Sequence, residues 1–259
     1  MKSRAVRWLA LSFLLPLLAL SAHASSVNLG TAGSYAVLAG STVTNTGSSV
    51  LIGNLGVSPG CAVTGFPPGS VSGTINACNA ASGQAQRDLV TAYNEAMGLK
   101  PTATLTGKDL GGMVLTPGVY FFASSAQLTG TLTLNNLGNP NALFVFQIGS
   151  TLTTASSSSV IFTSSLGDPN VFWQVGSSAT LGTTTAFAGN ILALTSITLN
   201  NGASITCGSA LAINGAVTLN NNVISGCGGA STVPEPGTMG LLGTGLAILA
   251  GAARWRMRI

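Results

Sequence analysis

Residues 196–221 read SITLNNGASITCGSALAINGAVTLNN, and this stretch decides the fold. It contains nearly the same six residues twice, SITLNN and AVTLNN, and residues 131–136 give a third version, TLTLNN. Within each version apolar and polar residues alternate, as in a β-strand with one buried face, and an Asn-Asn pair is typical of a turn. The repetition indicates a strand and turn used again and again.

Apolar residues of related strands extend this repeat. We take the inward positions to be Leu132, Leu152, Leu181, Ile197 and Val217, which are spaced 20, 29, 16 and 20 residues apart. A drifting period of about 21 residues is typical of a β-solenoid, in which each coil covers the apolar face of the last. The alternative is a β-sandwich in which similar six-residue segments recur by coincidence.

The cysteines give an independent check on the period. Cys207 and Cys227 are also 20 residues apart, and equivalent positions on adjacent coils lie about 4.8 Å apart, a separation that a disulfide tolerates. We therefore pair Cys207 with Cys227 and, by exclusion, Cys61 with Cys78. Metal binding is the weaker alternative, because there is no CxxC pair and the single histidine, His23, lies in the first 24 residues.

One segment departs from the strand pattern. In residues 82–99, SGQAQRDLVTAYNEAMGL, apolar residues recur at the spacing of an amphipathic helix. Ser82 is the expected N-cap, and Gly98 and Pro101 mark the end. We expect this helix to pack one face along the β-core.

The first 24 residues follow the pattern of an export signal. A basic start is followed by an apolar run at 8–20 and by Ala22-His23-Ala24, the small-x-small pattern of a cleavage site. We expect the exported chain to begin at Ser25. An uncleaved anchor is the alternative, but the apolar run is too short to span a bilayer comfortably.

The carboxyl end carries a second processing signal. Residues 230–259 contain Pro234, Glu235 and Pro236, an uncharged apolar stretch at 237–253 that predicts a membrane-spanning helix, and a final cluster of arginines. This order resembles the PEP-CTERM sorting signal. The resemblance implies removal of the tail by an exosortase in the envelope of a Gram-negative bacterium, transfer to the surface, and exopolysaccharide as a further partner. A simple C-terminal anchor is the alternative.

Charge excludes several functions for residues 25–229. The formal net charge of +4 comes from the two ends, whereas the body holds three basic and four acidic residues. Such a surface cannot rely on phosphate neutralisation, so we expect no nucleic-acid partner. A β-helical polysaccharide lyase or hydrolase needs grouped carboxylates or other titratable residues in a groove. Asp88, Glu95, Asp109 and Asp168 are not grouped, and no calcium or phosphate loop is present, so we expect neither catalysis nor a metal or cofactor.

Strand alternation assigns the outward positions. We expect small hydroxyl-bearing side chains to form two files on one flat, nearly uncharged face: Thr129, Thr131, Thr133, Thr151, Thr153, Thr180, Ser196, Thr198 and Thr218. A threonine ladder can belong to any solvated strand, but solvated faces generally also carry charges. Fixed β-branched side chains at about 4.8 Å across coils and about 6.7 Å along a strand are spaced like the oxygens of ice planes.

Several ordered stretches of the body resemble the ice-binding-like proteins of bacteria and fungi. They are LGTAGSYAVLAGSTVTNTGSSVLIGNLGVSPGCAVTGFPPG at 29–69, PGVYFF at 117–122, NALFVFQIGSTLTT at 141–154, NVFWQVGSSATLGTTTAFAGNILA at 170–193 and ITLNNGASITCGSALA at 197–212. The resemblance implies an irregular right-handed β-helix of triangular cross-section, mainly β, with one long helix alongside. It also implies a cap between an early coil and the helix, which Cys61 and Cys78 would join.

Two functions remain open at this point. The resemblance implies an exported protein that binds ice through one flat face and inhibits ice growth and recrystallisation. We expect it to be a monomer. The alternative is a non-catalytic structural or adhesion protein of the cell surface or biofilm matrix, which the sorting tail favours.

Overall fold

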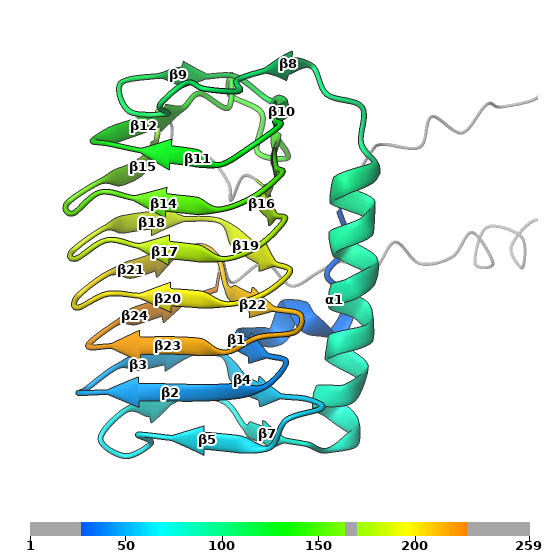
Figure 1. Ribbon diagram of the computed structural model, residues 1–259, viewed down its shortest axis with the longest axis vertical. Helices are drawn as coiled ribbons and strands as arrows, with labels where there is room; N and C mark the ends of the chain where they lie inside the picture. Colours follow the sequence, from blue (N-terminus) through cyan, green and yellow to red (C-terminus); the bar gives the residue numbers. More distant parts are fainter. Residues whose placement is uncertain (1–26, 164–169, 227–259) are drawn as a thin grey trace, which may run out of the picture.

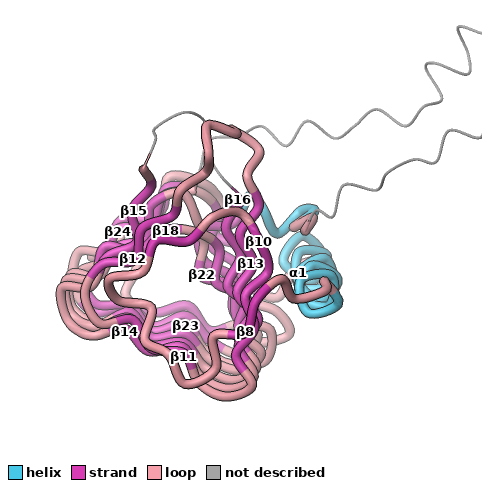
Figure 2. Tube along the Cα trace, turned by 90° about the horizontal axis from the view of Figure 1, so that it is seen from above, coloured by secondary structure: helices cyan, strands magenta, loops and turns pink. Residues whose placement is uncertain are grey.

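A stack of β-coils with three flat sides forms the body of the molecule (Figures 1 and 2). The structure is a computed structural model and describes residues 27–163 and 170–226. A complete coil contributes one short strand to each of three sheets, and every strand pair in the described residues is parallel. This arrangement confirms the predicted solenoid, because a sandwich is built from antiparallel pairs.

The strands fall into three sheets, which we call A, B and C. In stacking order, sheet A contains β7 (Ile75–Ala77), β4 (Asn54–Val57), β1 (Tyr35–Ala39), β22 (Ala210–Ala212), β19 (Asn190–Ala193), β16 (Asn170–Val175), β13 (Leu143–Ile148), β10 (Gly118–Phe122) and β8 (Ala103–Thr104). Sheet B contains β11 (Ala126–Leu128), β14 (Leu152–Thr154), β17 (Ala179–Leu181), β20 (Ile197–Leu199), β23 (Val217–Asn220), β2 (Thr42–Thr46) and β5 (Ala62–Thr64). Sheet C contains β6 (Ser70–Val71), β3 (Val50–Ile52), β24 (Val223–Ser225), β21 (Ser204–Thr206), β18 (Ala186–Ala188), β15 (Ser159–Phe162), β12 (Thr131–Leu134) and β9 (Val114–Leu115).

The coils are not stacked in the order of the sequence. The first coil, β1 to β3, lies inside the stack, between the second coil and the last coil, β22 to β24. From the first coil the chain runs to one end of the stack, and α1 (Ala80–Gly98) then carries it to the other end, from which the later coils return (Figure 1). Val37 of β1 consequently pairs with Ala210 of β22.

Inward side chains fill the centre of the triangle. In β12, β20 and β23, inward leucine, isoleucine and valine alternate with outward polar residues, as the period of two requires. Aromatic rings stack from coil to coil: Phe146 and Trp173 lie with centroids 3.8 Å apart, and Trp173 also donates from Nε1 to the Ala188 carbonyl. Trp173 is completely buried. In the core, similar side chains of successive coils therefore stack on one another.

The helix covers sheet A, as predicted, but its ends differ slightly from the expected range of 82–99. Asn79, not Ser82, is the N-cap, and Ser82 is the third helical residue of a capping box with Asn79. Both residues are good caps, so the sequence alone did not separate them. At the other end Gln147 of β13 donates from Nε2 to the carbonyls of Ala96, Met97 and Leu99, which otherwise lack helical partners.

A 3-10 helix, η1 (Gly30–Ser34), precedes β1 and packs against α1. Asp88 of α1 accepts hydrogen bonds from the backbone nitrogen and Oγ1 of Thr31, at 2.8 and 2.6 Å. Glu95 accepts one from the backbone nitrogen of Asn28 at 2.9 Å. Two of the few carboxylates of the body thus attach its amino-terminal segment to the helix.

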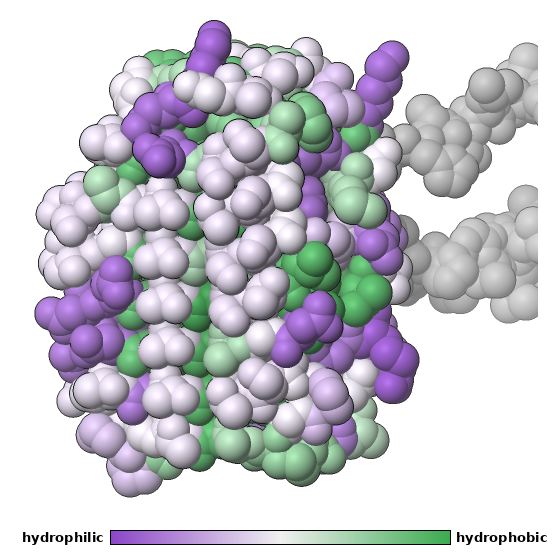
Figure 3. Space-filling model, viewed as in Figure 1, coloured by the Kyte–Doolittle hydropathy of each residue, from purple (hydrophilic) through white to green (hydrophobic). Residues whose placement is uncertain are grey.

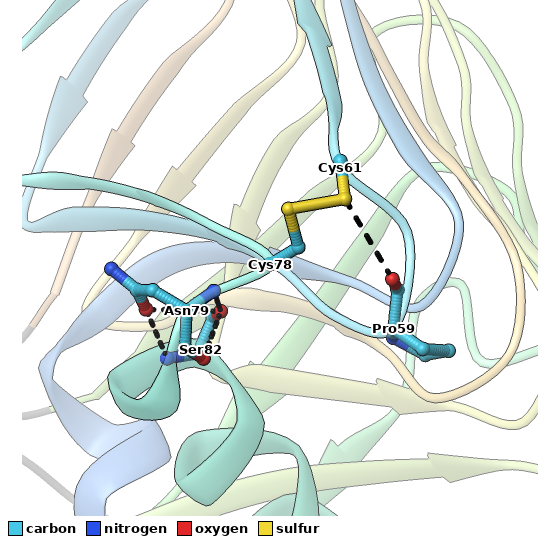
Figure 4. Close-up of a disulfide and its surroundings, with 5 residues drawn as sticks. All are labelled: Pro59, Cys61, Cys78, Asn79 and Ser82. Carbon is cyan, nitrogen blue, oxygen red and sulfur yellow. Dashed lines mark hydrogen bonds between the residues drawn. A yellow bond between two sulfur atoms is a disulfide. The ribbon is translucent and has the colours of Figure 1, made fainter.

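One predicted disulfide is confirmed in full. Cys61 and Cys78 are bonded across the terminal coil, with Cα atoms 4.8 Å apart, next to the N-cap of α1 (Figure 4). Cys207 is also disulfide-bonded. Its predicted partner, Cys227, lies outside the described residues, so that pairing stays a prediction.

The Asn-Asn pairs at 200–201 and 220–221 form part of the corner between sheets B and C. Asn221 follows β23 with a left-handed backbone, φ 50°, a conformation that asparagine tolerates better than most residues. Its Nδ2 donates to Oδ1 of Asn201 on the adjacent coil at 2.9 Å, and its Oδ1 accepts from the backbone nitrogen of Ser48 on the next. The pairs after β20 and β23 therefore tie neighbouring coils together at one edge of sheet B.

No helix among the residues that the structure describes is long and apolar enough to cross a membrane. The signal peptide predicted at 1–24, the sorting residues Pro234, Glu235 and Pro236, and the apolar stretch at 237–253 lie outside the described ranges.

Candidate functional site

Sheet B presents an unbroken ladder of threonines. One outward threonine of each of six strands pairs in register with its neighbours. They form the threonine ladder of Thr153, Thr180, Thr198, Thr218, Thr44 and Thr64 in stacking order. Gln127 of β11 continues the file at one end. With strands about 4.8 Å apart, five steps make the ladder about 24 Å long.

The ladder is held rigidly from beneath. Each threonine is exposed or half-exposed, while the residues on either side of it along the strand point inward and are largely buried; Ile197 and Leu199, beside Thr198, are examples. A β-branched side chain in a strand has a restricted χ1, so its methyl and hydroxyl keep their positions. The face therefore offers water an ordered array of both groups.

A second file runs beside the ladder but is less uniform. It includes the predicted Thr151 and Ser196, and the register adds Ser125, Ser178, Ala216, Thr42 and Ala62. Thr151 donates from Oγ1 to Oγ of Ser125 at 2.8 Å, which links two coils at the surface. The alanines remove the hydroxyl at two steps, so this file supports the ladder without matching its regularity.

The expectation that Thr129, Thr131 and Thr133 lie in line with Thr153 is wrong. Thr131 and Thr133 belong to β12 in sheet C, where they pair with Ser159 and Ile161. Thr129 lies at the corner between β11 and β12, where its backbone nitrogen donates to Oδ1 of Asp109. The chain turns from one sheet to the next at Gly130, whose φ of 92° few other residues adopt. Alternation continues through that turn, but the face changes.

The inward residue assigned to the first repeat changes sheet for the same reason. Leu132 is buried, as predicted, but it pairs with Val160 in sheet C, whereas Leu152, Leu181, Ile197 and Val217 are inward residues of sheet B. Of the three similar segments, SITLNN and AVTLNN therefore occupy equivalent positions in sheet B, whereas TLTLNN lies in sheet C.

Sequence reasoning missed Thr44 and Thr64, the two ladder residues of the amino-terminal coils. Thr64 pairs with Thr44 because the second coil stacks on the first, and Thr44 pairs with Thr218 because the first coil stacks against the last. A signal was present: TVT at 42–44 and AVT at 62–64 resemble AVT at 216–218. The stacking order explains the similarity, because it places the strands that contain these three sequences side by side in sheet B.

Sheet C lacks such uniformity. The outward file at the start of its strands reads Thr131, Ser159, Ala186, Ser204, Val223, Val50 and Ser70. Large aliphatic side chains interrupt the surface, and Ile52 and Val114 are 53% and 64% exposed. Sheet A is covered by α1, so sheet B is the one regular open face.

Charged residues are absent from the strands of sheets B and C as the structure describes them. Figure 3, which views sheet B, shows files of nearly white residues with apolar green between them and purple residues at the edges. The described charges belong to α1 and its carboxyl end (Arg87, Asp88, Glu95 and Lys100) and to the loop at one end of the stack (Lys108 and Asp109). Water over the ladder therefore meets no ionic side chain from these strands.

The carboxylates are engaged in structure. Desolvation raises the pKa of Asp88, but hydrogen bonds from Thr31 and Gln84 and the charge of Arg87 outweigh it, and the net pKa is lowered. The pKa of Asp109 is lowered in the same way: desolvation opposes, and hydrogen bonds from Gly111 and Thr129 prevail. Both groups are anionic acceptors for backbone amides. Within the described ranges, no three metal-ligating side chains of the His, Cys, Asp and Glu types are grouped.

Comparison with known families gives two matches. The model described as ice-binding-like matches residues 37–225, which include all three sheets and the threonine ladder. The PEP-CTERM protein-sorting motif matches residues 232–258. The first match covers most of the body that the structure describes. The second covers the carboxyl-terminal tail in which the sequence predicts a sorting signal.

Known proteins resemble the chain over most of its length. An ice-binding protein of Nostoc sp. (strain HG1) is 58% identical over 245 residues, which are 92% of this chain and 90% of that protein. The crystal structure of an ice-binding protein from the Antarctic ascomycete Antarctomyces psychrotrophicus superposes with a TM-score of 0.74 at 39% identity, covering 78% of this chain and 99% of the other. That of an ice-binding protein from an Antarctic biological consortium gives a TM-score of 0.73 at 46% identity, covering 76% and 90%.

Proposed function

Because the chain belongs to the ice-binding-like family, we propose that it is an exported protein that adsorbs to ice through the face of sheet B and inhibits ice growth and recrystallisation. The threonine ladder is the observation that supports this assignment. Six threonines on six consecutive strands are in register, on a face whose strands carry no charge.

The chemistry of the ladder accounts for adsorption. Methyl groups favour cages of ordered water, while hydroxyls hydrogen-bond to those cages and fix them to the protein. Because the side chains are already immobile, little conformational entropy is lost when the water shell joins a crystal. The repeats of about 4.8 Å across strands and about 6.7 Å along a strand let many groups act at once.

The direct test is a frozen sucrose film. Purified protein at micromolar concentration should halt the growth of ice grains on annealing, whereas the same protein after heat denaturation should not. Continued grain growth at high micromolar concentration of folded protein would remove the proposal.

The sorting motif supports export and association with the cell surface. We further propose processing by an exosortase in a Gram-negative envelope, with transient anchoring by the stretch at 237–253. An exopolysaccharide partner and a monomeric state are predictions of the same kind. A structural role in the surface or matrix, independent of ice, is the second candidate, and a film in which grains keep growing would favour it.

We propose no catalytic role. Asp88, Glu95 and Asp109 all accept hydrogen bonds from backbone amides of the fold, which leaves them poorly placed as acids or bases.

A further inference from the structure

A small cavity lies on the side of the molecule that carries the helix. It has a volume of about 260 Å³ and is lined by residues of η1, the start of β1, β4, β7 with the residue before it but one, and the first turns of α1. The amino-terminal end of α1 lies beside β7, at the end of the stack that the disulfide closes (Figure 1). The threonine ladder belongs to another side of the triangle, so a ligand in this cavity leaves the ladder free.

The lining of the cavity is polar and uncharged. Of the eight lining residues only Ala81 lacks a hydroxyl or an amide in its side chain, and none is acidic or basic. The carboxylate of Asp88 adjoins the cavity, but it accepts hydrogen bonds from two lining residues, Thr31 and Gln84. Such a lining favours a neutral ligand with several hydrogen-bonding groups over an ion or an apolar molecule.

Tyr35 forms a buried part of the wall, and a glycine makes room for its ring. The side chain is 4% exposed. A Cβ on Gly56 of β4 would lie 2.6 Å from Cε1 of the Tyr35 ring, so the ring occupies the space that a side chain at position 56 would need. Asn76 of β7 pairs with Gly56 in register. The ring of Tyr35 thus crosses one strand, and its hydroxyl lies by the amide of Asn76.

A chain of hydrogen bonds orients that amide. Asn79 accepts from the backbone nitrogen of Ser82 with its Oδ1, as the N-cap of α1 (Figure 4), so its Nδ2 is free to donate to Oδ1 of Asn76 at 2.9 Å. Asn76 must therefore turn its own Nδ2 toward Tyr35. Burial raises the pKa of Tyr35, and this amide opposes the rise by donating to the phenol oxygen. The phenol oxygen is thus an acceptor for Asn76, and its proton is left for a partner in the cavity.

Packing alone does not account for these polar groups. A phenylalanine at position 35 would fill the same space without a hydroxyl to desolvate, and a buried hydroxyl without a full set of partners costs stability. Thr74 adds a second open group. Its backbone nitrogen and oxygen are bonded to Asn54 and Leu55, whereas its hydroxyl has no partner among the residues that the structure describes. The cavity therefore offers at least two hydroxyls to a ligand.

From these contacts we propose that the cavity binds a neutral, polyhydroxylated small molecule of monosaccharide size. A sugar hydroxyl both donates and accepts, as a lining of hydroxyls and amides requires. The volume lies slightly below the range of about 300–1,000 Å³ that is typical of small-molecule sites, so a single sugar ring fits better than an oligosaccharide. Tyr35 and Thr74 are the main anchors. This site is independent of sheet B and of its contact with ice.

The test is a titration of the isotope-labelled full-length protein with glucose, galactose, mannose and sorbitol, followed by amide chemical shifts. Glucuronate serves as the charged counterpart of glucose. At least one neutral compound should shift the amides of Tyr35, Asn76 and Gln84 and saturate in the millimolar range, and glucuronate should bind more weakly. The amide of Thr198, on sheet B, should not move.

Four variants locate the site. Tyr35→Phe keeps the ring beside Gly56 and removes the hydroxyl, Thr74→Val keeps the shape of its side chain, and each should weaken binding roughly three- to tenfold. Ala81→Leu fills the cavity and should abolish binding. Tyr120→Phe is the matched control, because Tyr120 is similarly buried and its hydroxyl donates to the Thr116 carbonyl, remote from the cavity. It should bind the sugar as the unchanged chain does, and circular dichroism checks that all four are folded.

Three outcomes would overturn the assignment. If none of the four neutral compounds gives saturable shifts, the cavity is not a site for this class. Unchanged affinity in the folded Tyr35→Phe, Thr74→Val and Ala81→Leu proteins would place the sugar elsewhere on the molecule. Tighter binding of glucuronate than of glucose would show that the ligand class is charged. In each case a protein that still stops the growth of ice grains keeps the proposed function.

Discussion

Thr44 lies directly beside Thr218 in a parallel pair, although the two residues come from the first and last coils of the solenoid. This pairing extends the ladder from the four threonines of the later coils to six. The amino-terminal coils are therefore part of the candidate ice-binding face and not merely a cap below it.

Replacing Thr44 with tyrosine should weaken adsorption to ice as strongly as replacing Thr198. Either bulky ring lifts the crystal from neighbouring threonines, and a loss of about 1.4 kcal/mol of adsorption free energy lowers the affinity roughly tenfold. The minimum concentration that stops recrystallisation measures the effect. Thr206→Tyr, at an exposed position of sheet C in the same coil as Thr198, is the matched control and should leave that concentration unchanged. If Thr44→Tyr were as active as the control, the amino-terminal coils would not contribute to the face.

The sequence analysis placed Thr131 and Thr153 on one face, but variants at these two positions should differ in the same recrystallisation assay. Thr131→Tyr lies on sheet C and should retain activity, whereas Thr153→Tyr lies on the ladder and should lose it. Circular dichroism and melting curves check that both variants are folded. Equal losses from two folded variants would show that sheet C also contacts ice, contrary to our assignment.

Removing the terminal disulfide should lower stability without changing the face. The Cys61–Cys78 bond closes a loop with a sequence separation of 17 residues, for which the unfolded-state entropy model gives a stabilisation of about 3 kcal/mol. The double variant Cys61→Ala/Cys78→Ala should unfold at a lower urea concentration. Well below its melting temperature it should inhibit recrystallisation normally, and a large loss of inhibition in the folded variant would mean that the cap positions Thr64.

Acid should loosen the junction between the amino-terminal segment and the helix. The pKa of Asp88 is lowered from its ordinary value of 3.8 by the groups that bond its anion. A lowered pKa means that the carboxylate stabilises the fold above its unfolded pKa, and that this contribution is lost as pH falls through the folded pKa. The urea midpoint should therefore fall in this acid range.

Asp88→Asn should remove part of that pH dependence and reduce stability at neutral pH, because a neutral amide is a weaker acceptor for Thr31. Urea titrations of both chains from neutral pH into the acid range make the comparison. Parallel pH profiles for the two chains would contradict the role given to Asp88.

Much of the fold could be read from the sequence because local patterns specify it. Alternation predicted the inward residues of the five related strands, and the apolar spacing predicted α1 to within two residues at its start. The five inward residues, Leu132, Leu152, Leu181, Ile197 and Val217, are all buried. The errors arose at corners and between distant segments. Thr131 keeps the parity of Thr129 but lies on another sheet, because a turn at Gly130 preserves alternation and changes direction. Thr44 was missed because its neighbour Thr218 is fixed by the stacking order, which depends on packing over the whole molecule.

The position of the first coil between the second and the last also constrains when the chain can fold. β1 has β4 on one side but acquires its other neighbour only when residues 210–212 arrive. Until then the hydrogen-bonding edges of the first coil are open, and contacts between residues so far apart in sequence form slowly. Closure of the solenoid must therefore await synthesis of nearly the whole body. A nascent chain therefore cannot complete the stack until its last coil has been made.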